Sequence, residues 1–233
     1  MKKLKLITIC AVVGLLLITA APAMADDVIG PPWWPEEGQP PEGTVYAHWN
    51  SWADFPSTPG PLAPDDWESI PSGLTPSPYA FTYGVAWAAN YLGRTNLLKL
   101  YDDDQLKFYM PNFDNGNEHK EVWIQVTYSK DNGQYPLFHV NSEQGVTKTE
   151  SVLKDSVVWG TPWVTEAWSF QLSPNPAWEE IWLNFSSYGT NGITYVEQVV
   201  IDTWCHSSSV PEPATMALLG LGAIGLLRRK RSV

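Results

Sequence analysis

Glu121-Val-Trp-Ile-Gln-Val-Thr-Tyr-Ser129 alternates strictly between two kinds of side chain. One side of this stretch carries Val122, Ile124, Val126 and Tyr128, and the other carries Trp123, Gln125, Thr127 and Ser129. Successive side chains of a β-strand point to opposite faces, so a period of two predicts a half-buried strand over 121–129. Between the two chain ends, no stretch of a dozen residues shows a convincing helical period of 3.6.

The same alternation recurs along the chain, which predicts further strands at 44–49, 80–87, 105–110, 137–141, 163–172, 180–187 and 194–205. Turn signals such as Asp114-Asn115-Gly116, Asp131-Asn132-Gly133 and Asn191-Gly192 separate them. The pattern predicts an all-β domain, an antiparallel two-sheet sandwich of jelly-roll type, with an up-and-down barrel as the alternative. The absence of an internal repeat argues against a propeller or a solenoid.

The N-terminus predicts export. Lys2, Lys3 and Lys5 precede an apolar run over 6–21, and Ala23-Met24-Ala25 has the small residues at which signal peptidase cuts. We expect a signal peptide over 1–25, with a retained transmembrane helix as the alternative. Its removal takes Cys10 away and leaves Cys205 alone, so the mature protein has no internal disulfide. We expect Cys205 to be a buried apolar residue of the last strand; the alternative is a thiol that cross-links two copies.

The C-terminus combines three features: Val210-Pro211-Glu212-Pro213, an apolar run over 214–227, and Arg228-Arg229-Lys230-Arg231. Fourteen helical residues rise about 21 Å, less than the roughly 30 Å of a bilayer's hydrocarbon core. A short transmembrane helix of this kind inserts if cations snorkel and the bilayer thins, and the basic cluster keeps the chain end cytoplasmic. The pattern predicts a transient membrane segment, with an ordinary uncut anchor as the alternative.

This tail, over residues 210–231, resembles the PEP-CTERM sorting signal of bacterial envelope and exported proteins. The resemblance implies that an exosortase, a membrane-embedded transpeptidase-like protease, recognises the tail and cuts near Pro211-Glu212-Pro213. It also implies delivery to the cell envelope, the outer surface or the extracellular matrix, and an association with exopolysaccharide production.

The predicted order is a signal peptide (1–25), a Pro-rich extended spacer (26–43), a β-sandwich domain (44–206) and the sorting signal (207–233). A second Pro-rich stretch over 55–78 is expected to wrap over a surface, with Trp67 as a packing anchor. Without both ends the body keeps 7 basic and 24 acidic residues, a net charge of −17. Such a charge disfavours nucleic acid and anionic lipid, and favours neutral glycans, cations or basic surfaces.

All 13 tryptophans lie in the mature body, and three sit on the polar side of alternating strands: Trp123 with Gln125, Trp163, and Trp182 with Asn184. On one sheet these residues would form an aromatic platform edged by amides, which suits sugar rings. They are our candidate glycan-binding residues. Alternatively, the 55–78 segment or Trp33-Trp34 covers them as a second small core.

The stretch 194–205 is similar to the closing strand of jelly-roll carbohydrate-binding modules, which favours the same fold.

Asp102-Asp103-Asp104 and the turn 114–118 offer oxygen ligands for a structural Ca²⁺, although neither has the spacing of a known calcium loop, and a solvated turn is the alternative. No other cofactor is expected, because His48, His119, His139 and His206 show no zinc-ligand spacing. No nucleophile elbow or phosphate-binding glycine loop is present, so we expect no enzyme.

The leading hypothesis is a polysaccharide-binding protein. A purely structural envelope or biofilm component comes second, and a glycoside hydrolase using Glu121, Glu166 or Glu180 comes third.

Overall fold

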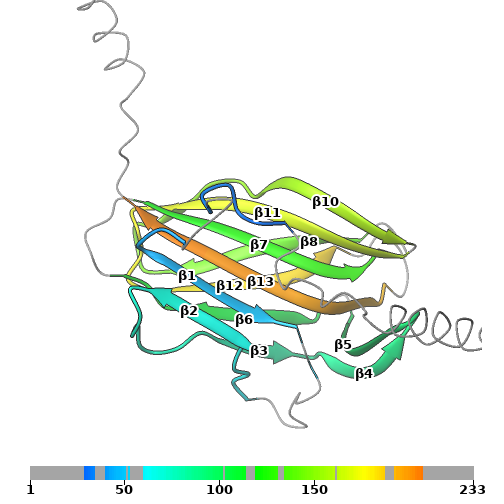
Figure 1. Ribbon diagram of the computed structural model, residues 1–233. Helices are drawn as coiled ribbons and strands as arrows, with labels where there is room; N and C mark the ends of the chain where they lie inside the picture. The colour runs from blue at the N-terminus through cyan, green and yellow to red at the C-terminus, as the bar shows by residue number, and fades with distance from the viewer. Residues whose placement is uncertain are drawn as a thin grey trace, which may run out of the picture.

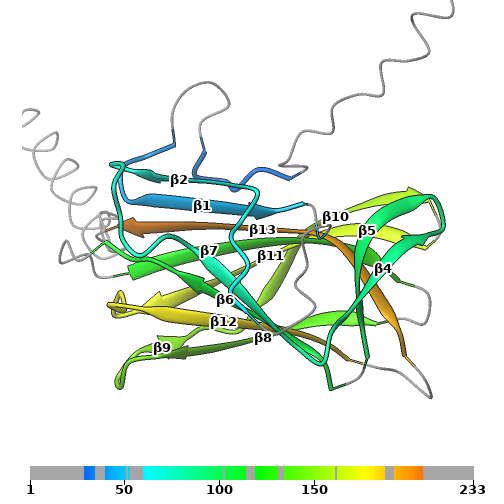
Figure 2. The same cartoon turned by 90° about the horizontal axis from the view of Figure 1, so that it is seen from below.

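The computed structural model describes residues 29–34, 40–50, 52, 60–101, 103–113, 119–130, 134–160, 162–186 and 192–206. Within these ranges the chain forms thirteen strands and no helix. All strand pairs are antiparallel, and they fall into two separately hydrogen-bonded sheets that lie face to face (Figures 1 and 2). The predicted all-β, two-sheet antiparallel architecture is therefore confirmed, and the barrel alternative is wrong.

Sheet A has nine strands in the central order β10-β11-β7-β13-β1-β2, with β5 paired to β13, β4 paired to β5, and β9 paired to β11. Its strands are β1 (Thr44–Trp49), β2 (Asp66–Ile70), β4 (Ala86–Tyr91), β5 (Arg94–Leu100), β7 (His119–Ser129), β9 (Thr147–Lys148), β10 (Val152–Gly160), β11 (Trp163–Ser173) and β13 (Thr194–His206). Sheet B has four strands in the order β3-β6-β12-β8: β3 (Tyr79–Tyr83), β6 (Gln105–Met110), β12 (Glu179–Ser186) and β8 (Tyr135–Ser142).

The last described strand, β13, is central in sheet A. It pairs with β7 along one side, while its other side pairs first with β5 and then with β1, as far as Thr44 opposite Trp204. The sheet therefore joins the first and last strands of the domain. A register shift between Val196 and Gln198 accompanies the change of neighbour from β5 to β1.

A single apolar core fills the space between the sheets, because the alternating residues of both inner faces meet there. Aromatic contacts cross from one sheet to the other: Trp49 of β1 lies 4.8 Å from Phe108 of β6, and Tyr128 of β7 lies 5.0 Å from Phe185 of β12, between ring centroids. Each of these side chains is almost or fully buried. Burial of this apolar area is the main favourable term in folding.

The strand β7 differs from the expectation in one respect. It is buried on both faces: Trp123, Gln125, Thr127 and Ser129, expected on an exposed face, are as buried as the core residues beside them. Segment 29–34, predicted to be part of an extended spacer, lies over this face and contacts it. β7 still alternates between apolar residues and polar or aromatic ones, but both of its faces are covered, so neither face is exposed to solvent.

The sequence interpretation also missed several strands. The 55–78 stretch was interpreted as irregular, yet it contains β2, which pairs with β1 and whose Trp67 packs against the core. The predicted strand 80–87 is divided at Gly84, whose φ of +76° lies in the region that favours glycine. β5, β9 and β10 were not predicted. β10 is exposed along nearly all of its length, so burial imposes no alternation on it.

Tyr128 carries a buried hydroxyl group within the core. The hydroxyl donates a hydrogen bond of 2.8 Å to Oε2 of Glu166, whose other carboxylate oxygen is 2.6 Å from Nζ of Lys130. Burial, reinforced by the Glu166 carboxylate, raises the pKa of Tyr128 above its ordinary value of 10.0. The folded protein thus holds a proton that the unfolded chain releases above that pH.

We predict that the free energy of unfolding falls as the pH rises above about 10, by about 1.4 kcal/mol per pH unit for this tyrosine. The sign follows because the unfolded state then binds fewer protons than the native state. Urea unfolding at several pH values checks it, and Tyr128→Phe should show a shallower alkaline decrease. An equal slope in the two proteins would contradict this assignment.

Candidate ligand-binding face

The outer face of sheet B is rich in aromatic and polar side chains. Because Ala80, Phe108, Ile181 and Leu183 point into the core, the residues next to them along each strand point outward. The strand registers place Trp182 of β12 beside Lys107 of β6 and beside His139 of β8. This face consists of Tyr79, Phe81, Tyr83, Lys107, Tyr109, Tyr135, Leu137, His139, Asn141, Glu180, Trp182, Asn184 and Ser186.

Lys107 organises the middle of this face. Its Nζ lies 5.2 Å from the ring centroid of Trp182 and 5.6 Å from those of Phe81 and Tyr83, which are cation–π distances. Nζ also donates to Glu180 Oε1 at 3.1 Å. Partial burial opposes the charge, but hydrogen bonds to Glu180 and Tyr83 outweigh it and raise the pKa of Lys107. The lysine is therefore charged and holds the surrounding rings in place.

Two pairs of parallel rings lie on the face. Tyr83 and Trp182 have an interplanar angle of 5° with centroids 6.1 Å apart, and Tyr79 and Tyr109 have an angle of 7° at 4.9 Å. Tyr83 is 45% exposed and Tyr135 is 37% exposed. Flat, partly exposed rings with a common orientation form a surface onto which another flat apolar surface can stack.

Three polar groups follow one another on the outward side of β12. Among the described residues, no hydrogen-bond partner is found for Trp182 Nε1, Asn184 Oδ1 or Ser186 Oγ. A polar group that is shielded from water and unpaired costs about 1–3 kcal/mol. The face thus combines aromatic rings with a donor, an acceptor and a hydroxyl that lie just beneath its surface, shielded from water and unpaired.

The structure does not bring the predicted glycan-binding residues together. Trp182 and Asn184 lie on the outer face of sheet B, whereas Trp123, Gln125 and Trp163 lie on the outer face of sheet A. The predicted aromatic platform required all three tryptophans on one sheet, so this prediction is wrong. The local pattern is the same at each position, but the strands belong to opposite layers.

Trp123 and Gln125 are covered by the segment 29–34. Trp123 Nε1 donates to the Ile29 carbonyl at 3.0 Å, and the Ile29 N–H donates to Gln125 Oε1 at 2.7 Å. Trp33 packs edge-on against Trp123 at 6.2 Å and stacks on Trp204 at 6.0 Å. Only 4% of Trp123 is exposed, so this tryptophan belongs to a small outer core of sheet A.

Trp163 is covered from the other end of the same sheet. Its Nε1 donates to the Leu92 carbonyl at 3.4 Å, and the guanidinium of Arg94 lies 5.0 Å from its ring. Leu92 lies in the turn between β4 and β5, and Arg94 is the first residue of β5. With 5% exposure, Trp163 presents no surface to a ligand.

The three carboxyls named for a hydrolase lie on three different surfaces. Glu121 is on the outer face of sheet A, Glu166 points inward to Tyr128, and Glu180 is on the outer face of sheet B. They do not face one cleft. Lys120 and Glu179 form a buried ion pair. The sequence interpretation did not identify this pair, because neither residue stands out as a charge within an apolar run.

The acidic turns proposed for calcium lie only partly within the described residues. Asp102 and the turn 114–118 lie outside the described residues, and Asp104 accepts the Tyr101 N–H at 2.7 Å, which closes the turn between β5 and β6. Within the described ranges, no group of three or more His, Cys, Asp or Glu side chains is placed to hold a metal ion. His119 and His206, far apart in sequence, are register partners with ring centroids 6.3 Å apart.

The predicted leader with Ala23 and Ala25, and the tail from Val210 to Arg231, lie outside the described residues. None of the described residues belongs to a helix with the length and hydropathy needed to cross a bilayer. A comparison with protein families matches residues 209–231 to the PEP-CTERM protein-sorting motif. No curated protein and no solved structure matches the chain. The motif marks an exported, cell-surface-directed protein that is processed by an exosortase.

We predict that the protein isolated from its native host begins near Asp26 and ends near Pro213. Intact-mass measurement of envelope and culture-medium fractions checks both ends. Replacing Pro211 and Pro213 by Ala should leave the basic cluster attached and keep the chain with the membranes. A native chain that still carries residues 228–231 would contradict processing of the tail.

Proposed function

We propose that this exported protein binds extracellular polysaccharide through the outer face of sheet B. The observation that carries the proposal is the combination, on this one face, of partly exposed parallel rings with hydrogen-bonding atoms that lie beneath them without a partner. A sugar ring exposes C–H patches that pack on aromatic faces, while its hydroxyls take up nearby donors and acceptors. Tyr83 and Trp182 would provide the stacking surface, and Asn184 and Ser186 would bind hydroxyls.

The contrast with sheet A supports the choice of face. Sheet A has more tryptophan on its outer side, but its candidates Trp123 and Trp163 are enclosed by other parts of the same chain. On sheet B, Tyr83, Tyr135, His139 and Asn141 remain exposed. A polymer can therefore lie across the strands of sheet B without displacing any of the segments that enclose the tryptophans of sheet A.

The electrostatics of the face suit a neutral or weakly charged glycan. Lys107 is paired with Glu180, and Asn141 donates to the other oxygen of Glu180 at 3.2 Å, so positive and negative charge are matched there. The remainder of the body is acidic, which disfavours polyanions. The proposal includes a sandwich of jelly-roll type, supported by the mixing of early and late strands in both sheets.

We predict that Trp182→Ala and Tyr83→Ala each weaken retention in native gels containing a recognised polysaccharide by roughly 5- to 150-fold. Loss of a stacked ring removes about 1–3 kcal/mol by analogy with other aromatic stacking platforms. Asn184→Ala should weaken retention by a smaller factor. The same panel of polysaccharides, titrated against tryptophan fluorescence, gives an independent measurement of affinity.

The matched control is Trp87→Ala, because Trp87 is 46% exposed and lies on β4 of sheet A. This variant should bind as the unaltered protein does. If no polysaccharide retards the protein, or if Trp87→Ala and Trp182→Ala lose binding equally, the face is not a glycan site. The protein would then be a structural envelope or matrix component. Reducing-sugar release from the same panel tests hydrolysis.

A further inference from the structure

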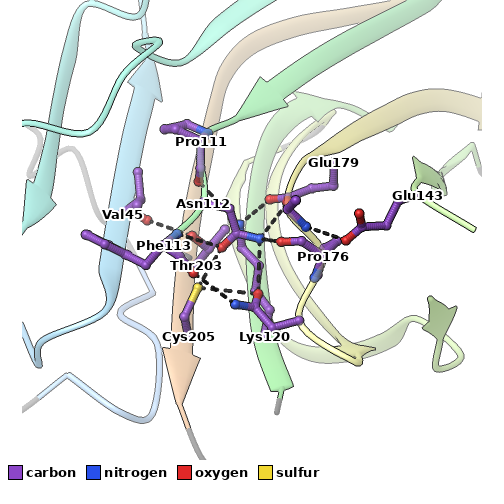
Figure 3. A network of polar contacts seen from close by, with 12 residues as sticks. Val45, Pro111, Asn112, Phe113, Lys120, Glu143, Pro176, Glu179, Thr203 and Cys205 are labelled. Atoms are coloured by element: carbon purple, nitrogen blue, oxygen red, sulfur yellow. Dashed lines mark hydrogen bonds and ion pairs between the residues drawn. The ribbon is translucent and has the colours of Figure 1, made fainter. Parts of the chain in front are cut away.

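A cluster of buried polar side chains lies at one end of the sandwich, where β6 ends, β7 and β12 begin, and β13 ends. Figure 3 shows Asn112 in the middle of this cluster, between Glu179, Pro176 and Cys205. Lys120 comes from sheet A and Glu179 from sheet B, and their side chains form an ion pair with no exposed surface on either. The cluster therefore bridges the two sheets inside the core.

The ion pair lies in the interior of the protein, where water cannot solvate its charges. Removing an ammonium and a carboxylate from water costs several kcal/mol each, and groups in such surroundings tend to neutralise instead. Burial raises the pKa of Glu179, although the nearby Lys120 opposes the rise. Transfer of one proton from Nζ to the carboxylate gives a neutral amine beside a neutral acid, and a neutral lysine amine is a nucleophile.

The side-chain amide of Asn112 lies against the same carboxylate. Its Nδ2 is 3.4 Å from Glu179 Oε2, while Lys120 contacts Oε1 of that carboxylate. Its Oδ1 accepts the Phe113 N–H at 3.0 Å and the Cys205 S–H at 2.8 Å. Burial raises the pKa of the Cys205 thiol, which keeps it protonated as a donor. The carbonyl oxygen thus faces two donors, and the amide nitrogen faces three acceptors: the Pro176 carbonyl, the Asn175 side chain and the Glu179 carboxyl.

We propose that Lys120 and Asn112 become joined by an intramolecular isopeptide bond, formed with the help of Glu179. The neutral Nζ of Lys120 attacks Cγ of Asn112, and a C–N bond forms as negative charge develops on Oδ1. The Phe113 N–H and the Cys205 S–H stabilise that charge, as donors in an oxyanion hole do.

The proton balance closes within the cluster. Glu179 gives its proton to Nδ2, the Cγ–Nδ2 bond breaks, and ammonia leaves. Nζ returns one proton to Glu179 and remains as the amide N–H. No oxidant, metal or cofactor is required, because the overall change is an exchange of one amide for another with release of ammonia. Glu179 acts as a general acid and base throughout.

Asn175 is the other amide in the cluster and has a different role. Its Oδ1 accepts from Asn112 Nδ2 at 3.0 Å, and its Nδ2 donates to the Phe113 carbonyl at 3.2 Å. Its Oδ1 also lies 3.7 Å from the Cys205 Sγ, so Asn175 contacts both Asn112 and the thiol that donates to Asn112. Asn175 is therefore a positioning residue, and Asn112 is the acceptor of the nucleophile.

Peptide mapping of the full-length protein tests the proposal directly. Trypsin cuts after lysine, so an isopeptide on Lys120 should yield one uncut peptide, Phe108 to Lys130, lighter than its sequence by one ammonia. A succinimide at an asparagine loses the same mass but leaves Lys120 cleavable. Lys130, whose side chain is 40% exposed, should still be cut and serves as the internal control.

The variant Glu179→Gln keeps the shape of the side chain but removes the acid, and we expect its Lys120 to be cleaved and its mass to be unreduced. A cross-link that persists in this variant would overturn the role of Glu179. If the variant does not fold, the map of the unaltered protein decides alone. A peptide Phe108 to Lys120 of full mass from the folded, unaltered protein would overturn the proposal.

Discussion

Pressing two apolar sheet faces together is the constraint on which the whole molecule depends. Between residues 26 and 209 the chain has one cysteine, Cys205, which is buried in β13, so no disulfide within this part of the chain holds its layers together. Cohesion between the sheets comes from contacts such as Trp49 with Phe108 and Tyr128 with Phe185. In each strand, alternate side chains must point into this core. The side chains between them therefore point outward, which fixes the position of the outward-facing rings.

The two sheets meet the solvent differently. Sheet A is closed on its outer side at both ends, by Trp33 near Trp123 and by the β4–β5 turn near Trp163. Sheet B has only four strands and keeps its rings accessible around Lys107. Trp123 and Trp163 of sheet A are therefore structural residues, whereas Trp182 of sheet B remains a candidate for binding.

Much of the architecture could be predicted from the sequence, because strand alternation is a local property. The strand at 44–49 was predicted with the bounds that the structure shows, and 121–129 lies wholly within β7. The candidate site could be predicted only in part. Trp123 and Trp182 each have an amide residue two positions on, Gln125 and Asn184, and only the pairing of distant strands places one under a cover and the other on a partly exposed face. The Lys120–Glu179 pair likewise depends on two sheets meeting.

The position of β13 has a consequence for biogenesis. This strand is central in sheet A and is also the last described segment before the sorting motif, which begins at residue 209. The sheet cannot close until nearly the entire polypeptide is available, because β1, β5 and β7 all wait for the same partner. The complete nine-stranded sheet A can therefore form only after the segment just before the sorting motif has become available.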